Sequence, residues 1–502
     1  MKKLSLPITL LFIFALFASP AISQDADADR IEKFVHQPEV EFDIYFLASD
    51  EFLGRDTGTQ ELKIASRYIA TTFQTNGVQK PDGYDSYFQE VPFLRLPVPQ
   101  SAEFRVDERT FTLGNDLLTL SPVRGEFSAE IIKLEYASEE EIAEQDVEGK
   151  FVVAEFGLPN VRSPQQAYGL SSEKRQWVQE AGGLGLIELY TSPQIPWPMI
   201  TNFLGGERIE VDSNGEQREQ IPHFWMNAVD GEKKDLISQQ DGETAQLSIE
   251  GDEPEEFNSR NVIGVVEGTD PDLKNEYILL SAHYDHIGLT DGAEPPFSGD
   301  EIHNGARDNA VGTSGIMFAA RYFAENPPKR SVIFAGWTAE EQGLLGSAYF
   351  AENPMIPLEE IVYNLNIDGA GYNDTTKVTV IGLGRTEADD DLKAAASAFG
   401  LEAIGDPVPE QNLFDRSDNV NFARNGIPAP TYSLGITDFD DEINKYYHQP
   451  ADEPDTINYS YITQYIRSYL FAAEAIANRD VAPFWIEGDV YEDAGKELYG
   501  RD

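Results

Sequence analysis

Apolar runs of strand length alternate with segments of helical periodicity from about residue 261 onward. Polar or glycine-rich stretches bound the apolar runs, and the segments between them repeat apolar residues every three or four positions. The sequence predicts strands at YILLSAHYDH, SVIFAGW, YNLNID, KVTVIGLG and APTYSLG, and helices over 310–326, 344–352, 387–399 and 459–477. This alternation predicts an α/β domain in which helices sandwich a mixed, mostly parallel sheet.

The pattern changes over residues 114–258, where short β-rich runs and polar turns dominate. One helix-like stretch, EKRQWVQEAGGLG, precedes the strand-like LIELY. We therefore expect a small β-rich domain inserted into the α/β domain. The α/β domain would then consist of residues 24–113 and 259–502.

The first 23 residues have the pattern of an export signal. Lys2 and Lys3 precede an apolar run over about residues 6–18, and residues 21–23, Ala-Ile-Ser, fit the small-x-small pattern of a cleavage site. The run is shorter than the ~20 apolar residues that span a bilayer, and no later stretch reaches that length. The sequence predicts a mature chain that begins near Gln24, has no membrane span and is secreted or periplasmic.

Charge and cysteine content narrow the possible chemistry. The 502 residues include 37 Lys and Arg against 88 Asp and Glu, a formal net charge of −51. Such a surface repels nucleic acid and anionic membranes, so we expect no nucleic-acid partner. The chain has no cysteine, which excludes disulfides, thiolate ligands and a cysteine nucleophile. Any metal would have to be held by His, Asp or Glu.

Acids and imidazoles follow the predicted strands, at the edge where parallel α/β sheets bind ligands. The candidates are His283 and Asp285 after the first strand, Glu340 and Glu341 after the second, Asp368 after the third, Asp308 at the start of the first helix, and His448 before the last helix. Each alone has an ordinary explanation, such as an N-cap or a turn. Together, with no lysine nearby in sequence, they would repel one another strongly unless dications lay between them.

Mixed imidazole and carboxylate ligands favour Zn²⁺ over Ca²⁺ or Mg²⁺, which prefer oxygen alone. One bridging carboxylate, with one His and one acid for each ion, would hold two Zn²⁺ ions about 3.5–4 Å apart. Glu340 and Glu341 would point to opposite sides of an extended strand, so we expect one to bind metal and the other to act as general base. Asp285 would lie on the same side as His283 and accept its second ring N–H.

These stretches closely resemble the secreted di-zinc aminopeptidase family, whose superfamily also holds glutamate carboxypeptidases and transferrin receptor ectodomains. The matching motifs are SAHYDHIG, NGARDNAVG, TAEEQGLLGS, NLNIDGAG and YYHQPADEPD. The resemblance implies the metal ligands His283, Asp308 (bridging both ions), Glu341, Asp368 and His448, with Glu340 as general base and Asp285 as the orienting partner of His283. It also implies the zinc exopeptidase type of α/β fold. The middle segment, with VEGKFVVAEFG and KRQWVQEAGGLGLI, resembles a protease-associated domain, a common insertion in this family.

Two positions depart from the family's pattern. RSDNVNF carries Asn419 where the family often has a histidine near the substrate pocket, and Arg307 stands where many relatives carry an acid or a small residue. No substrate-pocket role is carried over to either residue. His286 resembles a usual family position that is not a metal ligand, and we interpret it as structural.

The resemblance favours a secreted zinc-dependent exopeptidase, in the first place an aminopeptidase that hydrolyses N-terminal residues from peptides with water activated by two zinc ions. A carboxypeptidase or dipeptidase with the same metals is an alternative, because motif spacing does not report which peptide terminus is held. A non-catalytic, receptor-like ectodomain is another, although those members have lost ligands that this chain keeps. The inserted domain would restrict access to the cleft or mediate contacts in a homodimer.

Overall fold

The computed structural model describes residues 20–159, 161, 164–192, 195–212, 220–229, 240–290, 292–293, 295–297 and 299–501. Residues 1–19, most of the expected export signal, lie outside the described residues. Within the described part of the chain, the helices are too short or too polar to cross a membrane. The chain divides into two compact units: unit 1 contains Met1–Gln89 and Arg260–Asp502, and unit 2 contains Glu90–Ser259.

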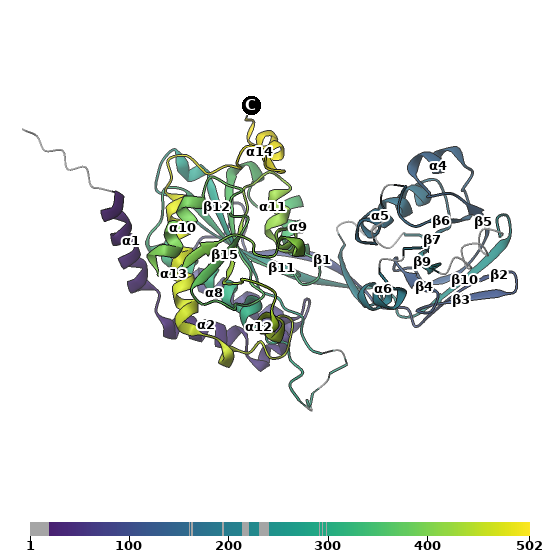
Figure 1. The fold of residues 1–502 in the computed structure, drawn as a ribbon, viewed down its shortest axis with the longest axis horizontal. Coiled ribbons are helices and arrows are strands. Elements are labelled where there is room, and N and C mark those ends of the chain that lie inside the picture. The colour runs from purple at the N-terminus through teal and green to yellow at the C-terminus, as the bar shows by residue number, and fades with distance from the viewer. Residues whose placement is uncertain are drawn as a thin grey trace, which may run out of the picture. The chain divides into compact units, whose positions relative to one another are not determined.

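A mixed sheet forms the centre of unit 1 (Figure 1). Its strands, in spatial order, are β16 (Glu402–Ile404), β15 (Lys377–Ile381), β17 (Thr431–Leu434), β14 (Ile361–Ile367), β12 (Tyr277–His283), β13 (Ser331–Trp337), β11 (Glu255–Val266) and β1 (Phe88–Leu96). The last two extend in sequence into unit 2, where β8 (Arg208–Val211) pairs with β1 as the ninth strand. The four central strands β17, β14, β12 and β13 are parallel, whereas β15 is antiparallel to β17 and β11 to β13. The predicted mixed, mostly parallel sheet is confirmed.

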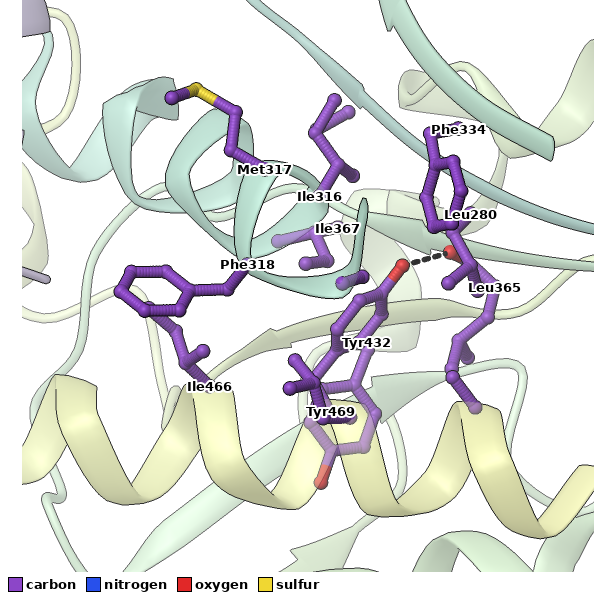
Figure 2. Packing of buried hydrophobic residues seen from close by; sticks show 14 of the residues in the cluster. Leu280, Ile316, Met317, Phe318, Phe334, Leu365, Ile367, Tyr432, Ile466 and Tyr469 are labelled. Atoms are coloured by element: carbon purple, nitrogen blue, oxygen red, sulfur yellow. Dashed lines mark hydrogen bonds between the residues drawn. The ribbon is translucent and has the colours of Figure 1, made fainter. Parts of the chain in front are cut away.

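Helices α8 (Val311–Glu325) and α13 (Tyr459–Ala477) pack on one face of this sheet. Figure 2 shows Phe318 of α8 and Tyr469 of α13 in the same cluster as Leu365 of β14, and the Tyr469 hydroxyl donates to the main-chain oxygen of Leu365 at 2.9 Å. The other helices of this cluster are α1 (Pro20–Phe34), α2 (Gln37–Leu47), α3 (Gln60–Thr75) and α10 (Asp389–Ala398). The prediction of a closing helix over 459–477 is confirmed.

The opposite face packs against α9 (Leu345–Glu352), α11 (Asn419–Ala423) and α14 (Glu492–Tyr499). Trp337, the last residue of β13, is fully buried and stacks on Phe422, with ring centroids 5.6 Å apart. Because both faces are covered, every residue of β13 and β14 is buried, and polar side chains there form hydrogen bonds, as where Asn364 donates to the Ser281 hydroxyl at 2.9 Å. Their carboxyl ends are consequently held in fixed positions. The remaining short elements of unit 1 are η1 (Asp50–Arg55), η3 (Leu273–Asn275), η4 (Ala306–Ala310), η5 (Leu358–Glu360), η6 (Pro409–Gln411), η7 (Leu413–Arg416), α12 (Asp441–Tyr446) and η8 (Pro454–Thr456).

Unit 2 contains an eight-stranded sheet in the order β3-β2-β10-β5-β6-β7-β9-β4. Its elements are β2 (Ser101–Val106), β3 (Arg109–Thr112), β4 (Leu117–Thr119), β5 (Gly125–Lys133), α4 (Glu139–Glu144), β6 (Phe151–Glu155), α5 (Pro164–Glu180), β7 (Gly185–Tyr190), α6 (Trp197–Leu204), β8 (Arg208–Val211, paired with β1), β9 (His223–Asn227) and β10 (Thr244–Glu250). The unit starts at Glu90, earlier than the expected residue 114. The reason is that β2 and β3 join this sheet through β10, a long-range pairing that local patterns do not reveal.

A buried charged cluster lies inside unit 2. The side chains of Lys174, Glu188 and His223 are all fully buried, and Lys174 forms an ion pair with Glu188. His223 Nε2 donates to Glu188 at 2.9 Å, and the Ser171 hydroxyl donates to the same carboxylate at 2.9 Å. Burial alone would raise the pKa of Glu188, but Lys174 and His223 lower it to about 2. Burial also lowers the pKa of His223, so the folded unit holds a neutral imidazole beside an ionised carboxylate.

Acid should therefore destabilise unit 2. The unfolded chain takes up a proton at His223 near pH 6.5, before the folded unit does, and Glu188 acts in the same direction between about pH 4.5 and 2. Such a group removes up to about 1.4 kcal/mol of unfolding free energy per pH unit between its two pKa values. We expect amide hydrogen exchange of β7 and β9, corrected for the intrinsic rate, to accelerate from pH 7 to 5, and His223→Gln to weaken this dependence. An equal pH dependence in both proteins would contradict the prediction.

Candidate metal centre

Three neighbouring strands end at the same edge of the unit 1 sheet. His283, the last residue of β12, is in register with Trp337, the last residue of β13, and β14 lies on the other side of β12. Asp368 follows β14 directly, and a short turn after Trp337 leads to Glu340. The structure thus brings together side chains that the sequence places up to 85 positions apart, the separation of His283 and Asp368.

His283 faces two of the predicted acids. Its Nε2 atom lies 3.2 Å from Asp308 Oδ1 and 3.4 Å from Asp368 Oδ1, and its side chain is only 1% exposed. Its Nδ1 donates to the main-chain oxygen of Asp285 at 3.2 Å. This hydrogen bond selects the tautomer that leaves Nε2 free to bind a metal.

The second imidazole lies on the other side of Asp308. His448 Nε2 is 3.3 Å from Asp308 Oδ2 and 3.1 Å from Glu341 Oε2. The two oxygens of one carboxylate therefore face two different imidazoles. This is the arrangement in which a carboxylate can be shared by two cations.

The segment that carries Asp308 is an irregular turn, η4, at the start of α8. Gly305 precedes it with φ 57°, and a Cβ there would lie 2.2 Å from the Asp308 main-chain oxygen and 2.6 Å from the His286 ring. Glycine is thus the residue that fits this left-handed position. On the other side, the Asn309 side chain donates to the main-chain oxygen of Ile367 at 2.9 Å and accepts from the Gly312 N–H at 3.0 Å. These contacts fix Asp308 against the end of β14.

Asp285 has a different contact from the one expected. Its carboxylate accepts the main-chain N–H groups of Glu340 at 3.2 Å and Glu341 at 3.3 Å, whereas its Oδ1 atom is 3.8 Å from His283 Nδ1. The predicted hydrogen bond from the imidazole to this carboxylate is therefore wrong: the main-chain oxygen accepts the proton instead. The carboxylate fixes the turn that carries the two glutamates.

Glu340 and Glu341 belong to different groups of side chains. Potential ligand atoms of Glu340, His283 and Asp368 lie within 4.8 Å of one another, and so do those of Glu341, His286 and Asp308. The turn that separates them includes Ala339 at φ 57°, so the pair follows a tight turn rather than an extended strand end. The two adjacent carboxylates nevertheless point to different groups of side chains, Glu340 to the first and Glu341 to the second.

Their electrostatic environments also differ. Burial raises the pKa of both carboxyls, and at Glu340 the charges of Asp368 and Glu341 raise it further, well above the usual range. At Glu341 burial and Asp308 are outweighed by His286 and His448, which lower the pKa to about 2. Neighbouring glutamates thus have pKa values shifted in opposite directions, a pattern typical of acid–base sites.

His286 contacts a predicted ligand, which its interpretation as a structural histidine did not anticipate. Its Nδ1 lies 2.6 Å from Glu341 Oε1, and the ring is fully buried. Its Nε2 has no hydrogen-bond partner among the described residues. His286 therefore orients Glu341 from the side opposite to His448. The only sequence signal for this role is its position three residues after His283.

No lysine lies near these acids in the sequence, but two buried arginines lie near them in the structure. Arg55 donates to the main-chain oxygens of Tyr284 and Gly305 at 3.0 Å, and burial lowers its pKa to about 10. Arg307 forms an ion pair with Asp452 at 2.8 Å. The buried acids outnumber the two arginines, and they also raise the pKa of the His283 and His448 imidazoles despite burial.

Asp418, the aspartate of the RSDNVNF motif, is a further buried acid, for which the sequence predicted no role. One oxygen accepts from the Ser347 hydroxyl at 2.5 Å, and Oδ2 has no hydrogen-bond partner in the described part of the chain. Burial raises its pKa to about 7, and the charges of Asp368 and Asp285 act in the same direction. Asn419, which follows it, is buried and donates to the main-chain oxygen of Ala429 at 3.1 Å, so its side chain serves the packing of this turn.

The donor sets fit two divalent cations. One set offers His283 Nε2, Asp308 Oδ1 and Asp368 Oδ1, and the other offers His448 Nε2, Asp308 Oδ2 and Glu341 Oε2. One imidazole nitrogen with two carboxylate oxygens is a ligand set suited to Zn²⁺. Dications would also offset the buried negative charge.

Zinc should raise the melting temperature of the metal-free protein. A ligand present at 100 times its Kd adds about 2.7 kcal/mol to the unfolding free energy. Asp308→Asn keeps the shape of the side chain but removes the charge common to both sets, so most of this increase should be lost. Differential scanning calorimetry with Zn²⁺, and with Mg²⁺ as the control ion, measures the effect. Equal stabilisation of the wild type and the variant would refute the shared site.

Comparison with known proteins finds a family model that matches part of this chain. Residues 261–472 match the model of peptidase family M28. Aminopeptidase YwaD of Bacillus subtilis is 26% identical over 285 residues, which cover 56% of this chain and 54% of that protein. The vacuolar membrane protease of Kluyveromyces lactis is 31% identical over 115 residues, 23% of this chain and 11% of that protein. The chain thus spans about half the length of the first relative and a small part of the second.

A solved structure shares the fold. An aminopeptidase from Aneurinibacillus sp. strain AM-1 aligns with a TM-score of 0.57 and 19% identity over 91% of this chain and 97% of that chain. Over residues 261–472, the chain resembles peptidase family M28. The family resemblance of the motifs is confirmed.

Proposed function

We propose that this protein is a secreted, zinc-dependent exopeptidase that removes N-terminal residues from peptides. The observation that carries the proposal is the position of Asp308, whose two carboxylate oxygens lie 3.2 Å from His283 and 3.3 Å from His448. The named activity of the Bacillus subtilis relative supports an aminopeptidase. Secretion rests on the export pattern of the first 23 residues.

The ligands would be the five residues of the two donor sets, with Asp308 common to both. When bound, two zinc ions would polarise the scissile carbonyl and lower the pKa of the attacking water. Asp285 holds the main-chain amides of Glu340 and Glu341, and His286 holds the second oxygen of Glu341. These contacts keep the ligand and the base in separate positions.

Glu340 moves the proton in this mechanism. It accepts a proton from the attacking water, and it returns that proton to the amine nitrogen as the peptide C–N bond breaks. Burial and the neighbouring acids raise its pKa, which suits a group that must both take up and release a proton near neutral pH. Glu341, with its pKa lowered to about 2, stays ionised as a ligand should.

Glu340→Gln should lower kcat by about 10²–10⁴-fold, because it removes the general base but not a ligand. Both zinc ions should stay bound. Glu341→Gln is the matched control, since the same change one residue later should weaken metal binding. Steady-state kinetics combined with elemental analysis after dialysis distinguishes the two. Near-wild-type turnover of Glu340→Gln would exclude it as the base.

Free N-termini should be required for hydrolysis. A panel of aminoacyl-nitroanilides and short peptides, each free or N-acetylated, compares the two forms, and we expect acetylation to abolish turnover. Peptides amidated at the C-terminus should remain substrates. Hydrolysis of acetylated peptides that amidation blocks would instead indicate a carboxypeptidase, and a requirement for both free termini would indicate a dipeptidase.

A further inference from the structure

Asp452 links the segment that carries Asp308 to the loop that carries His448. Three successive main-chain N–H groups donate to it: Ala306 to its main-chain oxygen at 3.1 Å, and Arg307 and Asp308 to its Oδ2 atom at 2.8 and 3.2 Å. Asp452 is 1% exposed. Since it lies four residues after His448, it fastens the two segments together close to both proposed ligands.

Arg307 strengthens the same link through its side chain. Its guanidinium donates to Asp452 Oδ1 at 2.8 Å and to the hydroxyl and main-chain oxygen of Thr456 at 2.8 and 2.9 Å. It also stacks on Tyr446, 3.8 Å from the ring centroid, and faces Tyr372 at 5.2 Å. Tyr372 follows Asp368 by four residues. One buried guanidinium, adjacent to Asp308 in the chain, thus contacts the segments beside two further proposed ligands, His448 and Asp368.

Of the proposed ligands, His448 depends most on contacts of this kind for its position. Its side chain is 36% exposed, against 1% for His283, and its backbone adopts φ 54°, a left-handed conformation that costs a non-glycine residue free energy. Neither a strand nor a helix holds it, because α12 ends at Tyr446 and the next element begins at Pro454. Its position relative to Asp308 must be set by contacts of the loop.

We propose that Arg307 and Asp452 are a positioning pair that sets the distance between His448 and Asp308, and so controls the affinity of the second metal position, the one formed by His448, Asp308 and Glu341. Neither residue of the pair is one of the proposed metal ligands. The inference rests on the proposed function only in assuming that both positions bind zinc. It assigns a role to Arg307, the residue that departs from the family's pattern.

Zinc titration with chelator competition, backed by elemental analysis, tests the pair. The wild type should bind two ions per chain, and His448→Ala identifies which binding step belongs to the second position. Arg307→Met should weaken that same step by about 10–100-fold and leave the other within about twofold, as expected for a residue that orients a ligand. Asp452→Asn should act on the same step, and Arg307→Lys, which keeps the charge but not the planar contacts, should restore part of the affinity.

Arg385 and Asp489 provide a matched control pair. Arg385 donates to Asp489 at 2.8 and 3.0 Å and stacks on Phe414 at 4.0 Å, so Arg385→Met removes an equivalent ion pair and stacking contact. The Arg385→Met variant should have a lower melting temperature in the metal-free state, but the dissociation constants of both zinc-binding steps should stay unchanged. Equal weakening of both steps in Arg307→Met, or no change in either, would overturn the positioning role.

The same measurements separate this inference from the proposed function. A wild-type protein that binds two ions but hydrolyses no peptide would refute the exopeptidase, while the zinc constants of the variants would still support or overturn the positioning pair. A wild-type protein that binds fewer than two ions would overturn both.

Discussion

The site in unit 1 depends on how the repulsion between carboxylates buried at one sheet edge is offset. Two like charges 4 Å apart repel by about 4 kcal/mol at an effective dielectric constant of 20. Domains are stable by only about 5–15 kcal/mol, so a few uncompensated pairs would consume that stability. Arg55 and Arg307 offset a part of the charge. Under the proposed function, two dications between the imidazoles and acids would offset the rest.

The charged cluster of unit 2 shows the contrasting case. Glu188 is also fully buried, but Lys174, His223 and Ser171 all contact it, so its charge is compensated within the chain. Such a cluster needs no ligand, and its function is structural. In unit 1, by contrast, the acids face imidazoles and one another more than they face cations. Burial of charge alone therefore does not indicate a metal site, whereas uncompensated burial does.

The sheet positions some of the proposed site residues, and irregular loops position the others. β12, β13 and β14 are covered on both faces, and they hold His283, Glu340 and Asp368 through short connections. Asp308 and His448 lie on irregular segments, and their positions come from side-chain contacts such as Asn309 with Ile367 and Asp452 with the amides of η4. In a site of this kind, the fold fixes the residues at the strand ends, whereas a few side-chain contacts fix the residues on the loops.

Local pattern was sufficient for the five strands and four helices of unit 1 that the sequence predicted, because strand alternation and helical periodicity are properties of short windows. The order of the acids after those strands was also readable, since the carboxyl ends of parallel strands meet at one edge. Long-range strand pairing could not be predicted from local pattern. Because β2 pairs with β10 and β3 pairs with β2, unit 2 starts earlier than the sequence suggested.

The chain by itself determined which residue types could bind metal and in which order they occur, because these follow from composition and from motifs of a few residues. Only the tertiary structure decided that the main-chain oxygen of Asp285, not its carboxylate, receives the His283 proton, and that His286 holds Glu341. It also brought Arg55 and Asp452 to the acids from distant segments. Such contacts depend on distances of a few ångströms between loops, and no local sequence pattern encodes these distances.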